Sequence, residues 1–310
     1  MPDPIRLGDA ALLGIDPNKI GISYSGGGAL VVIELGIASA FVKQGIVPAV
    51  ITGVSAGSLA GTAHALDPVS GKGVQLAADI LGHVSNQLLG LTPWSILGRV
   101  LMERENLVSL GDQAPVGPRI TAGLASNLGL TNVTIGYFQP PLPRLMIATT
   151  DVENREGVWL PEDIRIEDAV IASSSIPGVF PWRTLTINGQ QRVLVDGGVV
   201  MNQPLSNLVE QGCGTIYACA VGPVGPLPPP KNALDNFMRA TDLAMHQATK
   251  LEEAFVQCKM GGNGKVHHIH PIVSGVSSDN FDFTPDLVKS IMAEAETQTL
   301  NWLNQPGGPP

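Results

Sequence analysis

The sequence GISYSGGGAL, residues 21–30, holds the feature on which the interpretation of the whole chain depends. A run of β-formers at 22–24 leads into three consecutive glycines, Gly26, Gly27 and Gly28, and an apolar helical pattern follows at once. Glycine loses more conformational freedom on folding than any other residue, so three together at a strand-to-helix turn need a reason. Either the turn is merely tight, or another group must come very close to its backbone.

Strand-like runs recur along the chain, and most are dense in Val and Ile with little strict alternation. Such runs are typical of strands that are covered on both faces. Helical patterns lie between many of them, for example at 29–44 and 56–65. This alternation predicts an α/β fold with a largely parallel central sheet. The runs expected as strands are 19–25, 48–54, 144–150, 192–195, 215–221 and 266–271.

No stretch has the composition of a flexible interdomain linker, so we expect a single domain over residues 1–310 with a core at about 19–275. Residues 67–140 lack clear strands and are expected to form a helical insert. A C-terminal helix and a frayed tail are expected at 284–310.

The composition is that of a globular protein, with 44% hydrophobic and 15% charged residues. The net charge is −9, and the chain has no block of consecutive Lys or Arg. Both features argue against a nucleic-acid partner and against purely electrostatic docking to anionic membranes. Apolar contact with lipid stays open, and the sequence carries no signal for an oligomeric state.

The three cysteines form no CxxC motif and are odd in number, which favours free thiols in a reducing compartment. The N-terminus has acidic residues and prolines where a signal peptide needs a basic start and a long apolar run. The longest apolar stretch, at 29–42, is interrupted by Glu34 and is too short to span a bilayer. We therefore expect a cytoplasmic protein without a transmembrane segment.

A second informative stretch, ITGVSAGSLAG, contains the GxSxG motif Gly53-Val54-Ser55-Ala56-Gly57 between a predicted strand and a helix rich in small residues. In this context the serine lies on a sharp turn with its hydroxyl lifted out of the sheet, and the glycines leave room where side chains would clash with backbone. The N-terminus of the following helix adds free N–H groups and a favourable dipole for developing negative charge. These features make Ser55 a candidate nucleophile.

Acyl transfer at such a serine gives a reason for the three glycines. The reaction builds an oxyanion, which needs two or three preorganised N–H donors about 3 Å away. A bare turn at Gly26, Gly27 and Gly28 can supply them and lets a substrate carbonyl approach the backbone. A dinucleotide-binding GxGxxG/A pattern fits less well, since it requires Gly or Ala where the chain has Val31, and no GxxxxGK[ST] loop exists.

A nucleophilic serine needs a base, and the stretch RVLVDGGVVMNQP offers one. A predicted strand runs directly into Asp196, and Gly197 and Gly198 leave space for a neighbour. An ordinary Asp-Gly turn is the alternative interpretation. A carboxylate is a weak base for a hydroxyl, so Asp196 can act only if it is desolvated and positioned for proton transfer concerted with attack.

Histidine is the alternative base, because the order Ser…Asp…His fits an α/β-hydrolase triad. However, His267, His268 and His270 lie in a predicted strand and His246 on a predicted helix, so none has the loop setting of a catalytic histidine. The same HHIH segment has no evident third ligand for a metal. We predict neither a metal nor another cofactor.

Taken together, these segments resemble the patatin-like phospholipases, in particular their bacterial branch, over about residues 19–221. Four blocks match in the family's order. They are the glycine turn at 26–28 (oxyanion loop), residues 53–58 (nucleophile elbow), ASSSIPGVFPW at 172–182 (an Ala-Ser-Ser/Ala-x-Pro segment), and Asp196-Gly197-Gly198 with Asn202 and Pro204 behind it (dyad acid).

This resemblance implies a three-layer α/β/α sandwich and a serine acyl hydrolase that uses a Ser-Asp dyad instead of a triad. Ser55 is then the nucleophile and Asp196 the base, and the reaction passes through an acyl-enzyme that water hydrolyses. The implied substrates are carboxylic esters of lipids, with peripheral and apolar membrane contact. The residues implied for the oxyanion hole are Gly26, Gly27, Gly28 and Ala56.

One position departs from the family pattern, which usually continues the glycine turn with a basic residue and another glycine. This chain has Leu30 and Val31 there. Loss of the cation predicts a preference for neutral or small esters, or a catalytically impaired lipid-binding protein on the same scaffold. Retention of both Ser55 and Asp196 favours an active enzyme. The apolar segment around Trp94 is the expected wall or lid for an acyl chain, with ordinary helix packing as the alternative.

Overall fold

The computed structural model describes residues 14–92, 95–96, 99, 108–113, 123, 126, 129–222, 229–230, 233–261 and 264–305. An eight-stranded sheet forms its centre. The strands are β1 (Asp16–Tyr24), β2 (Val50–Gly53), β3 (Arg144–Asp151), β4 (Glu156–Trp159), β5 (Arg183–Ile187), β6 (Gln190–Asp196), β7 (Cys213–Cys219) and β8 (Lys265–Ile269). Their order is β5-β6-β3-β2-β1-β7-β8, with β4 paired to β3.

The sheet has a parallel part and an antiparallel edge. The strands β1, β2, β3, β7 and β8 pair in parallel, whereas β4, β5 and β6 pair antiparallel to their neighbours. This confirms the prediction of an α/β fold with a largely parallel sheet. All six predicted strands are present within a few residues of their expected bounds, but β4 and β5 were not predicted.

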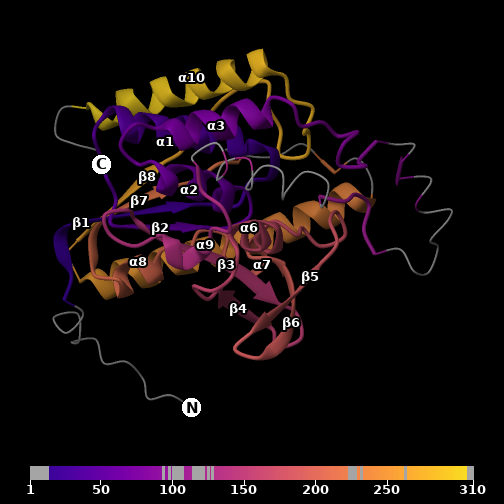
Figure 1. Ribbon diagram of the computed structural model, residues 1–310, viewed down its shortest axis with the longest axis horizontal. Coiled ribbons are helices and arrows are strands. Elements are labelled where there is room, and N and C mark those ends of the chain that lie inside the picture. Colours follow the sequence, from indigo (N-terminus) through magenta and orange to yellow (C-terminus); the bar gives the residue numbers. More distant parts are fainter. Residues whose placement is uncertain are drawn as a thin grey trace.

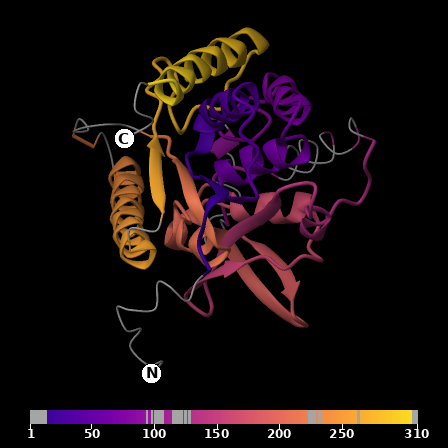
Figure 2. The same ribbon diagram turned by 90° about the vertical axis from the view of Figure 1, so that its left-hand side faces the viewer.

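Helices cover both faces of the sheet and make it the middle of three layers (Figures 1 and 2). One face carries α1 (Val31–Lys43), α2 (Ala56–Leu66), α3 (Lys72–Leu81) and α10 (Pro285–Leu303). The other carries α8 (Ser206–Glu210) and α9 (Ala233–Met260). The shorter elements are η2 (Gly28–Leu30), η4 (Ile135–Tyr137), α6 (Ile166–Ser173) and α7 (Gly198–Met201).

The alternating residues of β7 show why the central strands are apolar throughout. Ile216 and Ala218 face the smaller core cluster beneath α8 and α9, whereas Tyr217 and Cys219 face the larger cluster beneath α1 and α10. Successive side chains of a strand point to opposite faces, so a strand between two helical layers buries every position. This explains the absence of polar alternation in the sequence.

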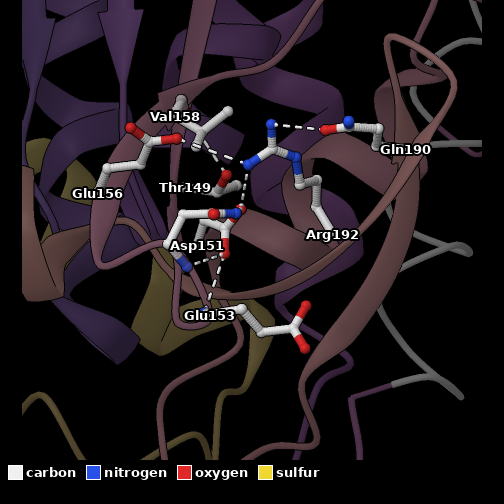
Figure 3. A network of polar contacts seen from close by, with 8 residues as sticks. Thr149, Asp151, Glu153, Glu156, Val158, Gln190 and Arg192 are labelled. Atoms are coloured by element: carbon white, nitrogen blue, oxygen red, sulfur yellow. Dashed lines mark hydrogen bonds and ion pairs between the residues drawn. The ribbon is translucent and has the colours of Figure 1, made fainter.

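A part-buried ion pair links β3 and β6 in the antiparallel edge (Figure 3). The carboxylate of Asp151, at the end of β3, accepts a 2.9 Å hydrogen bond from Arg192 of β6. It also accepts from the backbone and side-chain N–H groups of Asn154 and from the amide of Glu153. Burial raises the pKa of Asp151, but these bonds outweigh it and lower the pKa to about 2. The charged pair therefore fixes β6 against β3.

Two predictions fall outside the residues that the structure describes. The expected acyl-chain wall or lid around Trp94 is one, and the frayed tail at 306–310 is the other. The predicted C-terminal helix is present as α10, which begins at a Thr284 cap followed by Pro285. Among the described segments, no helix combines the length and hydropathy needed to cross a bilayer.

Candidate active site

Ser55 lies on the sharp turn between β2 and α2, in a strained backbone conformation with φ 51° and ψ −124°. Its amide donates a 2.9 Å hydrogen bond to the hydroxyl of Ser173, which supports this conformation. A Cβ on Gly53 would overlap the carbonyl oxygen of Gly57, and one on Gly57 would overlap that of Tyr24. The turn therefore needs both glycines of the GxSxG motif.

The hydroxyl of Ser55 donates a 2.6 Å hydrogen bond to Oδ2 of Asp196, the last residue of β6. The other carboxylate oxygen accepts from the amide of Gly198 at 2.7 Å. A Cβ on Gly197 would overlap the carbonyl oxygen of Ala148, so this turn also requires glycine. The fold thus brings the predicted nucleophile and base, both 5% exposed, into direct contact across 141 positions of sequence.

Burial raises the pKa of Asp196 from 3.8 to about 6, and the hydrogen bonds from Ser55 and from the Gly198 amide oppose the increase. A carboxylate with this pKa is a stronger base than an exposed aspartate and still carries its charge above about pH 6. The desolvation that sequence reasoning required of Asp196 is therefore present.

The amides of the glycine turn divide into one that is engaged and two that are free. The Gly26 amide donates to the carbonyl of Asn202 at 3.0 Å, which removes it from the predicted set of oxyanion donors. Gly27 precedes η2 and Gly28 begins it, and their amides have no hydrogen-bond partner among the described residues. The amide of Ala56, first residue of α2, is likewise free within that part of the chain.

Gly28 has a φ of 58°, in the left-handed region that favours glycine. A Cβ at this position would overlap the carbonyl oxygen of Ser278. The glycine turn is therefore both tight and closely approached, by Ser278 at Gly28 and by Asn202 at Gly26.

A pocket with an empty volume of about 700 Å³, part of it open to solvent, begins at Ser55, Ala56 and Gly28. Its polar side chains besides Ser55 are Gln113 and Ser174, and none of its described lining residues is charged. Such a lining suits an apolar chain rather than a charged group. The apolar walls are Val31, Leu59, Leu81, Val84, Leu89, Val170, Ile171, Ile176, Phe180, Phe281 and Phe283.

Leu30, where the family usually has a basic residue, is absent from this lining. Its side chain is 6% exposed and packs in the larger core cluster. The substitution therefore removes a charge without adding a wall to the pocket.

The histidines make no contact with the two candidate catalytic residues among the hydrogen bonds of the described residues. All six are described, and none bonds to Ser55 or Asp196. His64 is fully buried in α2, where its Nδ1 pairs with the hydroxyl of Tyr24 at 2.8 Å, and burial lowers its pKa to about 4. Within the described ranges, no group of three or more His, Cys, Asp or Glu is placed to hold a metal ion.

Sequence reasoning matched the segment at 172–182 to a family block but gave its residues no role. The structure shows that the segment supports both candidate catalytic residues. The carbonyl of Ser173 accepts from the Gly197 amide at 3.2 Å, and that of Ser175 accepts from the Asp196 amide at 2.9 Å. The run of three small hydroxyl residues at 173–175 was the available signal.

The family model described as Patatin-like phospholipase matches residues 22–209. Lysophospholipase NTE1 of Saccharomyces cerevisiae is 29% identical over 207 residues, which are 66% of this chain and 11% of the yeast protein. Lysophospholipase NTE1 of Kluyveromyces lactis is 26% identical over 212 residues, 66% of this chain and 13% of that protein. This chain thus spans only about a tenth of these relatives.

Solved structures with related folds have low sequence identity. Human GIVD cytosolic phospholipase A2 aligns with a TM-score of 0.47 and 12% identity, over 95% of this chain and 60% of that one. VipD from Legionella pneumophila aligns with a TM-score of 0.45 and 14% identity, over 92% of this chain and 66% of that one.

Proposed function

Because the chain belongs to the patatin-like phospholipase family, we propose that it is a serine acyl hydrolase that cleaves carboxylic esters of lipids. Ser55 is the proposed nucleophile and Asp196 the proposed base. The observation that carries this proposal is the 2.6 Å hydrogen bond between their side chains, on a strained turn beside an apolar pocket.

In the acylation step, ionised Asp196 accepts the proton of the Ser55 hydroxyl while Oγ attacks the carbonyl carbon of the ester. The carbonyl oxygen becomes an oxyanion, which the free amides of Gly27, Gly28 and Ala56 stabilise. The C–O bond of the ester then breaks. The leaving alcohol takes the proton from Asp196, which leaves the acyl group on Ser55.

Deacylation repeats these roles with water as the nucleophile. Asp196 accepts a proton from the water as its oxygen attacks the acyl-enzyme carbonyl, and the same amides stabilise the second oxyanion. Collapse of this intermediate returns the proton to Ser55 and releases the carboxylic acid. In both steps this chain supplies the base and the oxyanion donors, and water enters only as the second nucleophile.

The pocket supports an ester with a long apolar acyl chain as substrate. Its described lining offers apolar walls for the chain and no cation for a phosphate. The similar region of the NTE1 lysophospholipases makes single-chain lysophospholipids the first substrates to compare with neutral monoacyl esters.

Exposed apolar side chains near the acid turn support peripheral contact with a lipid surface. Trp182 precedes β5 and is 50% exposed, and Val199 and Val200 follow Asp196 on α7 with 36% and 40% exposed. Binding through such residues is expected to change little between low and high salt, because burial of apolar surface is not screened. A strong loss of liposome binding in salt would contradict this contact. The cytoplasmic location stays a prediction.

The proposed function is tested by intact mass after exposure to a long-chain fluorophosphonate, which phosphonylates an activated serine. We expect one adduct on the wild type and none on Ser55→Ala or Asp196→Asn. The chain offers a matched control in Asp67 and Ser70, a second hydrogen-bonded Asp–Ser pair that lies on an exposed turn without the pocket. Asp67→Asn and Ser70→Ala are expected to keep the adduct.

The other outcomes decide between the remaining interpretations. Labelling that survives in Asp196→Asn would indicate a hydrolase with a histidine base. A folded wild-type protein that takes no label would instead support a lipid-binding protein on this scaffold.

A further inference from the structure

Asn202, which follows α7, contacts both the glycine turn and the acid turn. Its carbonyl accepts the amide of Gly26 at 3.0 Å. Its side-chain Oδ1 lies 2.5 Å from the point that a Cβ on Gly26 would occupy, and 2.9 Å from the corresponding point on Gly198. One residue therefore touches the turn that carries the free amides and the turn that carries the base.

The Oδ1 atom of Asn202 is buried and has no hydrogen-bond partner in the described part of the chain. An unpaired buried acceptor is unfavourable, so its position there calls for a compensating role. The Cα–H bonds that a Cβ would replace on Gly26 and Gly198 point toward this oxygen, and such groups are at most weak donors. The side chain thus fills space between the two turns rather than completing a hydrogen-bond network.

The same contact explains why residue 26 is glycine. Gly26 does not have a positive φ, so its backbone conformation is open to alanine. What excludes a side chain is the amide oxygen of Asn202, together with Cβ of Ser55 at 3.3 Å. The constraint on Gly26 is therefore one of space, and Asn202 imposes most of it.

We propose that Asn202 is a positioning residue that locks the glycine turn to the acid turn and thereby directs the amides of Gly27 and Gly28 toward the carbonyl that Ser55 attacks. This inference rests on the proposed function. The carbonyl of Asn202 engages the first glycine amide and leaves the next two free, while its side chain keeps the spacing between the turns. The base and the oxyanion donors then share one support, which matters because small displacements of such donors slow a reaction strongly.

The first test is a double-mutant cycle of Gly26→Ala and Asn202→Ala, read as the rate of labelling by a long-chain fluorophosphonate. Gly26→Ala is expected to slow labelling about 100-fold, because the new methyl displaces Asn202 and its turn. Asn202→Ala alone is expected to slow it about tenfold. The double variant should react faster than Gly26→Ala, because the methyl then enters the space that Asn202 has left.

Gly27→Ala provides the matched control for this cycle. Its methyl would overlap Cγ2 of Val221 and does not meet Asn202, so Asn202→Ala should not rescue it. The proposal is overturned if Asn202→Ala labels at the wild-type rate, or if its effect simply adds to that of Gly26→Ala.

The second test uses Asn202→Asp and does not require the alanine variants to fold. Oδ1 of Asn202 and Oδ1 of Asp196 lie 2.9 and 3.0 Å from the same point, the Cβ position on Gly198. The other groups at Asp196 are the hydroxyl of Ser55 and the amide of Gly198, which carry no charge. A second carboxylate here should move the pH profile of labelling upward by about one pH unit, because like charges oppose ionisation. An unchanged profile would place Asn202 away from the acid turn and overturn the proposal.

Failure of the proposed function would look different from failure of this inference. If the wild type takes no label, the proposed function fails. The contact is then still tested by the thermal unfolding midpoints of the wild type, Gly26→Ala, Asn202→Ala and the double variant. Gly26→Ala should lower the unfolding midpoint, and adding Asn202→Ala to that variant should restore part of the loss. A midpoint that falls further in the double variant would exclude the contact itself.

Discussion

The pKa of about 6 at Asp196 has a direct consequence for the rate of the proposed reaction. Below this pH the carboxyl group is protonated and cannot accept the proton of Ser55. We expect fluorophosphonate labelling to rise with pH and to reach half its maximum near pH 6. The measurement is the labelling rate between pH 4.5 and 8, over a range in which the circular dichroism spectrum stays constant. A half-maximum near pH 4 would show that Asp196 is not desolvated.

The same raised pKa links Asp196 to folding stability. Between about pH 4 and 6 the folded protein holds a proton that the unfolded chain has released, so its stability falls as the pH rises through this window. Asp196→Asn removes the buried charge while keeping the shape. It should raise the unfolding midpoint above the wild type at pH 8 and leave it nearly unchanged at pH 4. Equal shifts at both pH values would contradict this linkage.

Ser173 tests how much the strained turn at Ser55 depends on one hydroxyl group. Ser173→Ala leaves the Ser55 amide without its partner and should slow labelling at least about tenfold. The loss of stability should be about 1–3 kcal/mol. Ser175→Ala is the matched control, because that hydroxyl is equally buried but bonds to Ile171 and Gln113 instead. If both variants label equally slowly, the support of Ser55 is not specific to Ser173.

At this scale, sequence reasoning reached the two residues proposed to carry the chemistry and missed the ones that contact and position them. Ser55 and Asp196 were found because each sits in a short motif with its own glycines. The bond from Ser55 to Ser173 joins residues 118 positions apart, and no local pattern encodes it. The use of the Gly26 amide by Asn202 was hidden for the same reason, which is why Gly26 was wrongly included among the donors.

Among the elements, β6 depends on the Asp151–Arg192 ion pair for its position. Asp151→Ala would leave part-buried Arg192 and the loop amides at 153 and 154 without their acceptor. We expect a loss of about 2 kcal/mol in the free energy of unfolding, measured by urea denaturation. Glu156→Ala is the control, because Glu156 lies 3.6 Å from Arg192 and is more than half exposed. A similar loss in both variants would contradict a special role for the part-buried pair.

The hairpin of β5 and β6 shows what element-level reading of the sequence overlooked. Asn188 and Gly189 join the strands, both with positive φ, and Asn-Gly between alternating apolar residues is a strong hairpin signal. A search for runs dense in Val and Ile finds the buried parallel strands but misses the segment RTLTI of β5, which has few such residues. In β5 the exposed positions alternate with more buried ones, because one face of the strand meets solvent, and this weakens its hydrophobic signal.

Over the whole molecule, the pocket joins parts of the chain that are far apart. Its walls come from segments near Val31, Leu59, Val84, Ile171 and Phe281. A long acyl chain in the pocket would therefore tie these segments together, whereas a short one would not.

We expect the long-chain phosphonate adduct to raise the unfolding midpoint more than a methylphosphonate adduct does. Each kcal/mol gained corresponds to roughly 2 °C in a protein of this size. Thermal unfolding of the two adducts measures the difference, and Ser55→Ala exposed to the same reagents is the control. Equal midpoints for the two adducts would show that the acyl chain lies outside the pocket.

The layered architecture followed from the sequence because it depends on composition repeated over many residues. The pocket could not be predicted from the sequence. Its walls are apolar residues such as Phe180 and Phe283, and no local pattern distinguishes them from other residues of the core. Only the fold shows which of them leave a space.

The separation of Ser55 and Asp196 along the chain also determines the time that passes between their synthesis. A ribosome adds roughly 5–20 residues each second, so the proposed base is made about 7–28 s after the proposed nucleophile, which lies 141 residues earlier in the chain. Until then the nascent chain carries a serine with no partner to activate it. The proposed site therefore becomes complete only after β6, the sixth of the eight strands along the chain, has been translated.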